Sequence, residues 1–243
     1  MRPSLRLLAL GIVTSMAGAT GVQAATYNAF EAFPTGMPTV GGQFQFGYAT
    51  ALGGALTLFN SYGTNGSSQW VSLNGGEPAV GRNPGATTLT LGTLRAEPGM
   101  LVMHPGAAGQ YAVVRFTAPT AGLYDIDASF YGLDTAGTST DVHILVDGIS
   151  IFTGAVNSAY VSGPGAGSTA DLQRSLLANQ NVDFVVGYGV NQTYFYDSTG
   201  MTAVLSVADP APTEPGTPVP LPGGLALLGA GLLGLGAVRR ASR

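Results

Sequence analysis

The 243-residue chain has no cysteine and no lysine, and only 9% of its residues are charged. Without cysteine it can form no disulfide framework, no thiol nucleophile and no zinc site with sulfur ligands. Its two histidines, His104 and His143, leave little choice of general base. Any chemistry must therefore come from carboxylates, hydroxyls and aromatic rings.

Positive charge is scarce in the middle of the chain. Residues 25–209 contain twelve Asp and Glu residues but four arginines, which gives a formal net charge of −8. A surface of that sign repels phosphate backbones, so we expect no nucleic-acid partner.

The amino-terminal segment has the pattern of a secretory signal peptide. Arg2 and Arg6 precede an apolar run from Leu7 to Val13, and Val22-Gln23-Ala24 supplies small residues for a cut between Ala24 and Ala25. We therefore predict a signal peptide over residues 1–24, signal peptidase as a partner, and export through the inner membrane. The alternative is a retained transmembrane helix, which the short apolar run disfavours.

The carboxyl-terminal segment is the longest apolar run. From Leu221 to Val238 there are 18 residues without a charge or a hydrogen-bonding side chain. A helix of that length covers about 27 Å, just enough for a bilayer core. The basic tip Arg239, Arg240 and Arg243 follows, and such residues hold a terminus on the cytoplasmic side.

Residues 219–243 resemble a PEP-CTERM protein-sorting signal of the VPLPA subtype. The short motif is Val219, Pro220, Leu221, Pro222 and Gly223, where Gly223 replaces the usual Ala and Leu221 the Glu of the parent signal. The resemblance implies an exosortase partner that removes the helix during export, so that anchoring in the inner membrane is transient. It also implies a Gram-negative source and an association with exopolysaccharide and biofilm matrix.

Two other interpretations of the tail stay open. One is a permanent single-span membrane anchor. The other is a buried amphipathic helix, which the lack of a 3.6-residue apolar period disfavours. Residues 208–220 contain five prolines in 13 positions, a composition typical of an extended spacer.

Residues 25–207 are expected to form one all-β domain. Alternating apolar and polar residues, separated by turns rich in glycine, predict strands at 111–117, 123–131, 141–146, 149–153, 172–177, 182–188 and 201–207. Tyr124, Ile126, Ala128 and Phe130 should point inward. In the third strand His143 and Leu145 should point outward, and the segment 132–140 should be a loop.

The predicted fold class is an antiparallel β-sandwich (jelly roll), flanked by the signal peptide and one carboxyl-terminal hydrophobic helix. Residues 98–206 resemble the jelly-roll, galactose-binding-like modules of bacterial surface proteins. The resemblance rests on His104-Pro105-Gly106, the run 114–119, Asp147-Gly148 and Asp197-Ser198-Thr199.

Aromatic residues are the candidate sugar-binding groups, because a ring stacks on the apolar face of a pyranose. We name Trp70, the only tryptophan, together with Tyr194 and Tyr196; Tyr160 and Tyr188 are further candidates. The alternative is that Trp70 packs between the sheets.

Carboxylates are the candidate metal ligands. Asp134, Asp141 and Asp197 lie in or beside loops rich in Gly, Ser and Thr, where carbonyl oxygens are also available. Jelly-roll modules bind structural calcium through such oxygens, so these three aspartates are the candidate calcium ligands. We expect no other cofactor.

The sequence offers weak candidates for catalysis. His143 and Asp141 share a strand face, but no Gly-x-Ser-x-Gly turn accompanies them, and a structural pair is the simpler interpretation. Asp125 and Asp127 lie about 7 Å apart along one strand. We name no catalytic residue. The expected function is a noncatalytic surface or extracellular protein of the polysaccharide matrix; the alternatives are a secreted carbohydrate-binding module and, less favoured, a secreted glycan hydrolase.

Overall fold

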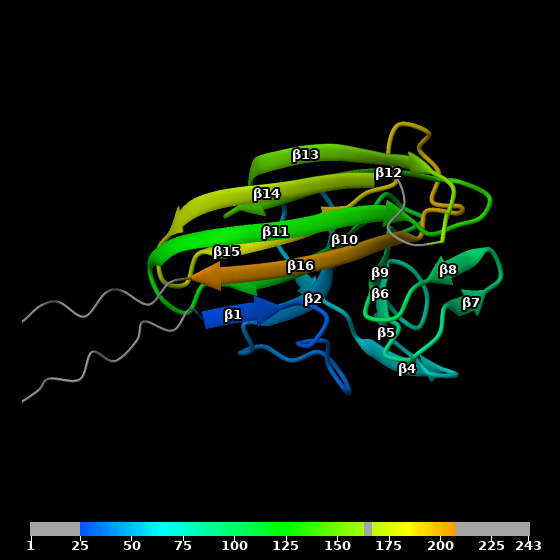
Figure 1. The fold of residues 1–243 in the computed structure, drawn as a ribbon, viewed down its shortest axis with the longest axis horizontal. Helices are drawn as coiled ribbons and strands as arrows, with labels where there is room; N and C mark the ends of the chain where they lie inside the picture. Colours follow the sequence, from blue (N-terminus) through cyan, green and yellow to red (C-terminus); the bar gives the residue numbers. More distant parts are fainter. Residues whose placement is uncertain (1–24, 163–166, 208–243) are drawn as a thin grey trace, which may run out of the picture. The chain divides into compact units, whose positions relative to one another are not determined.

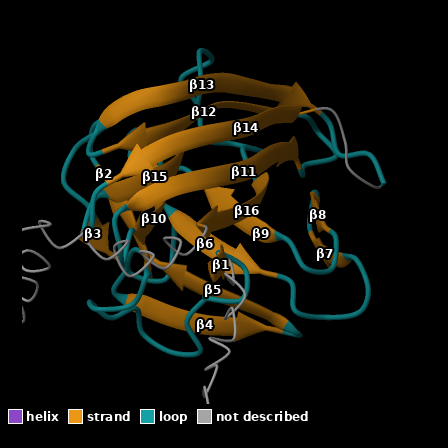
Figure 2. Ribbon diagram, turned by 60° about the vertical axis from the view of Figure 1, so that its left-hand side comes forward, coloured by secondary structure: helices purple, strands orange, loops and turns teal. Residues whose placement is uncertain are grey.

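A computed structural model describes residues 25–162 and 167–207, which form sixteen strands joined by loops and turns (Figure 2). The predicted signal peptide, proline spacer and sorting signal lie outside the described residues. In chain order the strands are β1 (Ala25–Asn28), β2 (Phe44–Ala49), β3 (Thr57–Leu58), β4 (Ser61–Asn65), β5 (Ser68–Ser72), β6 (Ala79–Arg82), β7 (Leu89–Leu91), β8 (Leu94–Ala96), β9 (Leu101–His104), β10 (Tyr111–Thr117), β11 (Gly122–Gly132), β12 (Thr138–Val146), β13 (Ile149–Ser158), β14 (Gly167–Leu176), β15 (Asn181–Val186) and β16 (Thr199–Val207).

The strands form two large antiparallel sheets and one small hairpin. The eight-stranded sheet has the order β14-β11-β16-β9-β6-β5-β4, with β1 also paired to β16, and the six-stranded sheet has the order β13-β12-β15-β10-β2-β3. Strands β7 and β8 pair with each other. Figure 1 shows β14, β11 and β16 lying over β12, β15 and β10. The predicted antiparallel β-sandwich is therefore confirmed, while the predicted terminal helix lies outside the described residues.

The core lies between the two sheets. On β11, Tyr124, Ile126, Ala128 and Phe130 are all fully buried, as their alternation predicts. They pack in one hydrophobic cluster with residues of the facing sheet, such as Phe116 of β10. The hydroxyl of Tyr124 donates a hydrogen bond to the carbonyl oxygen of Thr120 at 2.9 Å, so this buried polar group is satisfied.

The expectation for the third predicted strand was partly wrong. Strand β12 begins at Thr138, inside the segment expected to be a loop. His143 and Leu145 do lie on the face opposite the core, but they are 6% and 1% exposed. Leu145 joins a second apolar cluster on the outer face of the six-stranded sheet, against which Leu56 packs. The chain before β3 thus covers a face that alternation alone assigns to solvent.

Strand β16 fixes the positions of the ends of the described domain. Ala25 of β1 pairs with Val207, the last residue of β16. Thr199, the first residue of β16, pairs with Met103 of β9 at the other end of the strand. In residues 25–162 and 167–207, no helix has the length and apolar character needed to cross a bilayer.

Candidate functional site

A pocket of about 520 Å³ opens on the outer face of the eight-stranded sheet. Its floor comes from β5, β6 and β9, and alternation explains why these strands serve two environments. Val71 and Met103 point into the main core. Their neighbours Trp70, Val102 and His104 point the opposite way and line the pocket.

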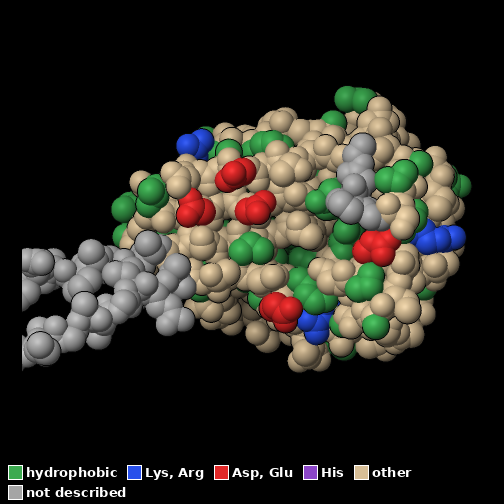
Figure 3. All heavy atoms as spheres, viewed as in Figure 1, with side chains coloured by type: hydrophobic (Ala, Val, Ile, Leu, Met, Phe, Trp, Pro, Cys, Tyr) green, Lys and Arg blue, Asp and Glu red, His purple; other side chains and the backbone are tan. Residues whose placement is uncertain are grey.

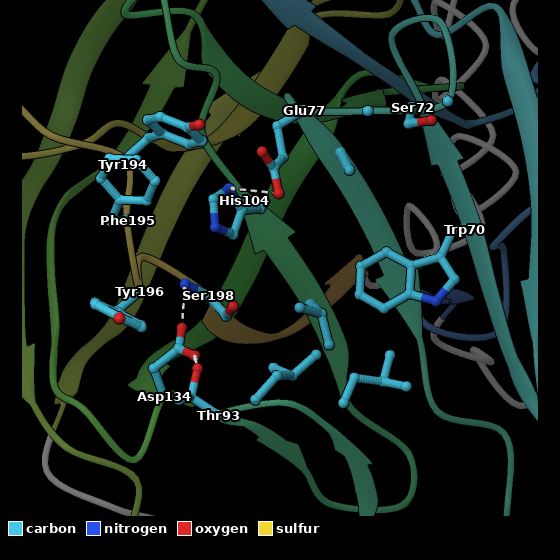
Figure 4. Close-up of a pocket in the computed structure, with 16 residues that line it drawn as sticks. Trp70, Ser72, Glu77, Thr93, His104, Asp134, Tyr194, Phe195, Tyr196 and Ser198 are labelled. Carbon is cyan, nitrogen blue, oxygen red and sulfur yellow. Dashed lines mark hydrogen bonds and ion pairs between the residues drawn. The ribbon is translucent and has the colours of Figure 1, made fainter.

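Trp70 lies across its neighbouring strand because that strand has glycine at the facing position. Gly81 pairs directly with Trp70, and a Cβ atom at Gly81 would lie 2.5–2.7 Å from three atoms of the indole ring. One face of the ring is therefore covered by the backbone of β6. The indole Nε1 donates a hydrogen bond to Oγ of Ser68 at 2.9 Å, which fixes the ring in its plane. Trp70 is half-buried and faces the pocket (Figure 4).

Three consecutive aromatic residues form the opposite wall. Tyr194, Phe195 and Tyr196 lie in the loop between β15 and β16, across the pocket from Trp70 in Figure 4. The rings of Tyr194 and Phe195 have centroids 4.5 Å apart, and the Tyr194 ring meets the His104 ring edge-on at 6.1 Å. Phe195 and Tyr196 are 62% and 52% exposed. Burial of these rings in a protein core therefore does not explain their presence.

The backbone at Tyr196 is strained. Its φ is +64°, in the left-handed region that bulky side chains rarely adopt. Such strain persists only where neighbouring groups fix the chain, and it is concentrated at binding and active sites. Here the two following residues are held firmly, as the next contacts show.

Buried aspartates hold the aromatic loop in place. The backbone N–H of Ser198 donates to Oδ2 of Asp134 at 2.8 Å, and the hydroxyl of Thr93 donates to Oδ1 of the same carboxylate at 2.6 Å. The N–H of Ser139 donates to Oδ1 of Asp197 at 3.1 Å. The loop is thereby tied to β12 and to the turn between β7 and β8.

The carboxyl group of Asp197 sits in an unfavourable place for a charge. Asp197 is fully buried, and no partner is found for its Oδ2 among the described residues. Burial, opposed by the hydrogen bond from Ser139 and reinforced by the negative charges of Asp134 and Asp141, raises the pKa of Asp197 to about 7.

Two polar residues stand on the upper rim of the pocket as drawn in Figure 4. Oε1 of Glu77 lies 4.0 Å from Nδ1 of His104, beyond hydrogen-bonding distance. The same Nδ1 lies 2.8 Å from the carbonyl oxygen of Pro105. A carbonyl oxygen only accepts hydrogen bonds, so Nδ1 carries a proton, and a neutral His104 has its acceptor at Nε2.

The structure brings together all three predicted sugar-binding residues. Trp70 lines the same pocket as Tyr194 and Tyr196, although it is more than a hundred residues away from them in the sequence. Trp70 does not lie between the two large sheets: it is on the outer face, where it packs in part against the apolar cluster that includes Leu94 and Val102. Sequence reasoning missed Phe195 and Glu77 as members of the site. The run Tyr-Phe-Tyr in a predicted loop was an available signal for Phe195, whereas nothing in the sequence pointed to Glu77.

The further candidate tyrosines lie elsewhere. Tyr160 packs against the apolar cluster that includes Leu94 and Val102. It also donates a hydrogen bond to Glu97, which raises the pKa of Tyr160. Tyr188 lines a separate pocket of about 310 Å³, together with Tyr111 and Asp141.

The expected calcium ligands do not form one site. Across residues 25–162 and 167–207, no three His, Cys, Asp or Glu side chains converge into a group that could hold a metal ion. Asp134 is occupied by Thr93 and Ser198, as described above. Asp141 accepts from the N–H of Gly189 at 2.7 Å and contacts His143. Hydrogen bonds within the domain therefore involve both carboxylate oxygens of Asp134 and of Asp141, whereas Asp197 is held through Oδ1 alone.

His143 and Asp141 form the expected pair. Nε2 of His143 lies 2.8 Å from Oδ2 of Asp141, and its Nδ1 lies 3.1 Å from Oγ1 of Thr153 on β13. The hydrogen bond and charge of His143, together with the N–H of Gly189, lower the pKa of Asp141, although burial, the largest influence, acts against them. His143 is buried, and it links Asp141 of its own strand to Thr153 of the neighbouring strand β13. Asp125 and Asp127 are exposed on β11.

A scan against models of protein families found no match, and a search of curated proteins found none either. Among solved structures, the chain is similar to a family 35 carbohydrate binding module from an environmental isolate, with 17% identity, 45% of this chain and 74% of that chain covered, and a TM-score of 0.29. It is also similar to a family 35 module from Clostridium thermocellum, with 10% identity, 75% and 97% covered, and a TM-score of 0.31. A third similar structure is a CBM35 from Paenibacillus barcinonensis, with 12% identity, 76% of this chain and 99% of that chain covered, and a TM-score of 0.27. At such TM-scores the assignment of the fold rests on the sheets described above.

Proposed function

We propose that the domain is a noncatalytic carbohydrate-binding module, and that it holds a glycan between Trp70 and the segment Tyr194–Tyr196. The observation that carries the proposal is the flat Trp70 ring, which lies over Gly81 and faces three further aromatic rings across one pocket. The C–H groups of a pyranose stack on such ring faces, and polar groups around them select its hydroxyls.

The exposure of the rings supports the same conclusion. A group of large apolar side chains that stay half-exposed beside a pocket is typical of an interaction site. Phe195 and Tyr196 are both more than half exposed, while the backbone beneath them is fixed by Asp134 and Asp197. A preformed aromatic wall loses little side-chain freedom when a ligand binds, and this lowers the cost of binding.

A glycan array probed with the full chain tests the proposal, with Trp70→Ala as the site variant. We expect specific glycans to bind, and Trp70→Ala to weaken their binding by about thirtyfold, which corresponds to about 2 kcal/mol. The control is Leu123→Ala, which removes an exposed apolar side chain of 54% exposure from β11 instead. Binding that is equal in all three proteins, or no glycan binding at all, would refute the proposal.

We propose in addition that the chain is exported and then processed at both ends. The support is the order of basic start, apolar run and small residues before Ala25, together with the motif at 219–223, the apolar run and the arginine tip. In this proposal signal peptidase and an exosortase act in turn. The glycan-binding domain is then placed outside the cell, where extracellular polysaccharide is its partner.

Mass spectrometry of the protein collected outside the cell tests the processing. We expect a mature start at Ala25 and an end within residues 218–224. Detection of residues 225–243 still attached to exported protein would contradict removal of the tail and favour a permanent anchor.

A further inference from the structure

Carboxylates line the pocket, but arginine and lysine do not. The carboxylates of Glu77 and Asp134 line it, and among the described residues no arginine does. The sequence has no lysine that could supply a cation from elsewhere. Arg95 lies nearby on β8, but its Nη1 donates to the carbonyl oxygens of Gly92 and Leu94 at 2.7 and 2.8 Å. Among the described residues the one lining side chain that can carry a positive charge is His104, and only when it is protonated. A glycan carboxylate in this pocket would therefore meet the carboxylate of Glu77 without an arginine or lysine to pair with.

The two carboxylates differ in what they can offer a ligand. Asp134 is 2% exposed, and each of its oxygens already accepts a hydrogen bond, from Thr93 and from Ser198. Its role is to hold the loop. The side chain of Glu77 is 43% exposed, and its Oε1 lies 4.0 Å from Nδ1 of His104, beyond hydrogen-bonding distance. Glu77 thus has acceptor capacity to spare at the rim of the pocket.

We infer that the pocket selects sugars that carry a free ammonium group, such as unsubstituted amino sugars, and that Glu77 accepts from that ammonium. The inference rests on the proposed glycan site and adds the class of sugar. The aromatic rings bind the pyranose without regard to its charge, while Glu77 distinguishes an ammonium from a hydroxyl, an acetamido group or a carboxylate. The net charge of −8 over residues 25–209 acts in the same direction at long range.

Four tetrasaccharides test the inference by calorimetry on the full chain: the β-1,4-linked tetramers of glucosamine, N-acetylglucosamine and glucose, and the α-1,4-linked tetramer of galacturonic acid. We expect the glucosamine tetramer to bind about five- to tenfold more tightly than the glucose tetramer at low salt, as expected for a charge-assisted contact that is partly open to water. The galacturonic acid tetramer should bind most weakly. Added salt should reduce the preference for the amine.

Variants separate a local contact from a general field. In Glu77→Gln the preference for the glucosamine tetramer over the glucose tetramer should fall to about one- to twofold. The control Asp125→Asn removes the same charge from the exposed face of β11 and should keep the full preference. A full preference in Glu77→Gln, or equal binding of amine and neutral tetramers by the unaltered chain, would overturn the inference and leave the proposed function standing. If the chain binds no glycan of any kind, the proposed function fails and the inference fails with it.

Discussion

The domain contains two groups of aromatic rings in opposite environments. Between the sheets, Phe116 contacts Tyr27, Phe44 and Tyr124, with ring centroids 5.0, 5.3 and 5.9 Å away. Phe116 and Tyr124 are completely buried. At the pocket, the rings of Tyr194 and Phe195 are as close to each other, at 4.5 Å, yet Phe195 is 62% exposed. The rings are therefore close to one another in both groups, and the two groups differ in how deeply the rings are buried.

The difference lies in what positions each group. Core rings stand on regular strands, where alternation directs every second side chain inward. Pocket rings depend on exceptions: a glycine at position 81 that lets Trp70 lie flat, and a strained loop held by buried aspartates. The core group should consequently govern stability, and the pocket group should govern binding.

The largest effect is expected from Phe116→Ala. Loss of this ring leaves a cavity where both sheets meet, and we expect the free energy of unfolding to fall by about 3–5 kcal/mol. Chemical denaturation of the full chain measures the change. If the stability of Phe116→Ala stayed within about 0.5 kcal/mol of the unaltered chain, Phe116 would not hold the two sheets together.

The next effect concerns the buried carboxyl group beneath the exposed rings. The pKa of Asp197 is about 7 in the folded domain, above the value of about 3.9 expected when unfolded, so the folded state holds this proton more tightly. The contribution of Asp197 to stability is therefore full below about pH 4 and is lost as the pH rises to about 7. Its size is on the order of 2–4 kcal/mol.

Thermal unfolding at about pH 5 and about pH 8 checks this sign. Asp197→Asn cannot ionise, so the variant should gain melting temperature relative to the unaltered chain at the higher pH, by about 2–4 °C for each kcal/mol. The pH dependence that other carboxylates cause is common to both proteins and cancels in the difference. A constant difference between them at both pH values would contradict the shifted pKa.

A third change moves the Trp70 ring without removing it. In Gly81→Ala the new methyl group would lie 2.5 Å from the ring, so the indole must move out of its plane over β6. We expect glycan affinity to fall about tenfold and stability to fall by about 1–3 kcal/mol. The control Gly63→Ala introduces the same methyl group beside Trp70 on the other neighbouring strand, where nothing lies within 4 Å. Equal affinities in the two variants would show that the orientation of Trp70 does not matter.

The smallest effect on stability is expected from Phe195→Ala. An exposed ring contributes little to folding, so the free energy of unfolding should change by less than about 0.5 kcal/mol. Binding should nevertheless weaken by about two- to fivefold, since the ring stands at the pocket wall. A loss of stability as large as that of Phe116→Ala would mean that the pocket wall is part of the core.

Sequence reasoning recovered the strands that have one face in the core and the other in water. Residues 111–117 match β10 at both ends, and the four inward residues of β11 are all buried, because alternation over a long strand has one interpretation. It failed where burial depends on a second layer of chain. His143 and Leu145 lie on the outer face, as expected, but Leu56 packs against the cluster that contains Leu145, and Thr153 of the neighbouring strand β13 contacts His143.

The site was recovered in part. Rings in loops can be named from the sequence, which is why Trp70, Tyr194 and Tyr196 were found. Their meeting depends on the pairing of β9 with β16, and that contact is set by the order of strands in the sheet rather than by any local pattern. The same limitation hid Glu77, and it led to a calcium site at aspartates that hold loops instead.

Beyond these rings, the position of β16 has a mechanical consequence. Ser198 lines the pocket immediately before this strand, and Val207 ends it where β1 begins. A pull between a bound polymer and residue 207 would run along β16, which Figure 1 shows on the face of the domain that Figure 3 draws as spheres. The hydrogen bonds of β16 to β11 stand at right angles to that direction. All the hydrogen bonds between β16 and β11 would then be loaded together in shear, instead of breaking one after another.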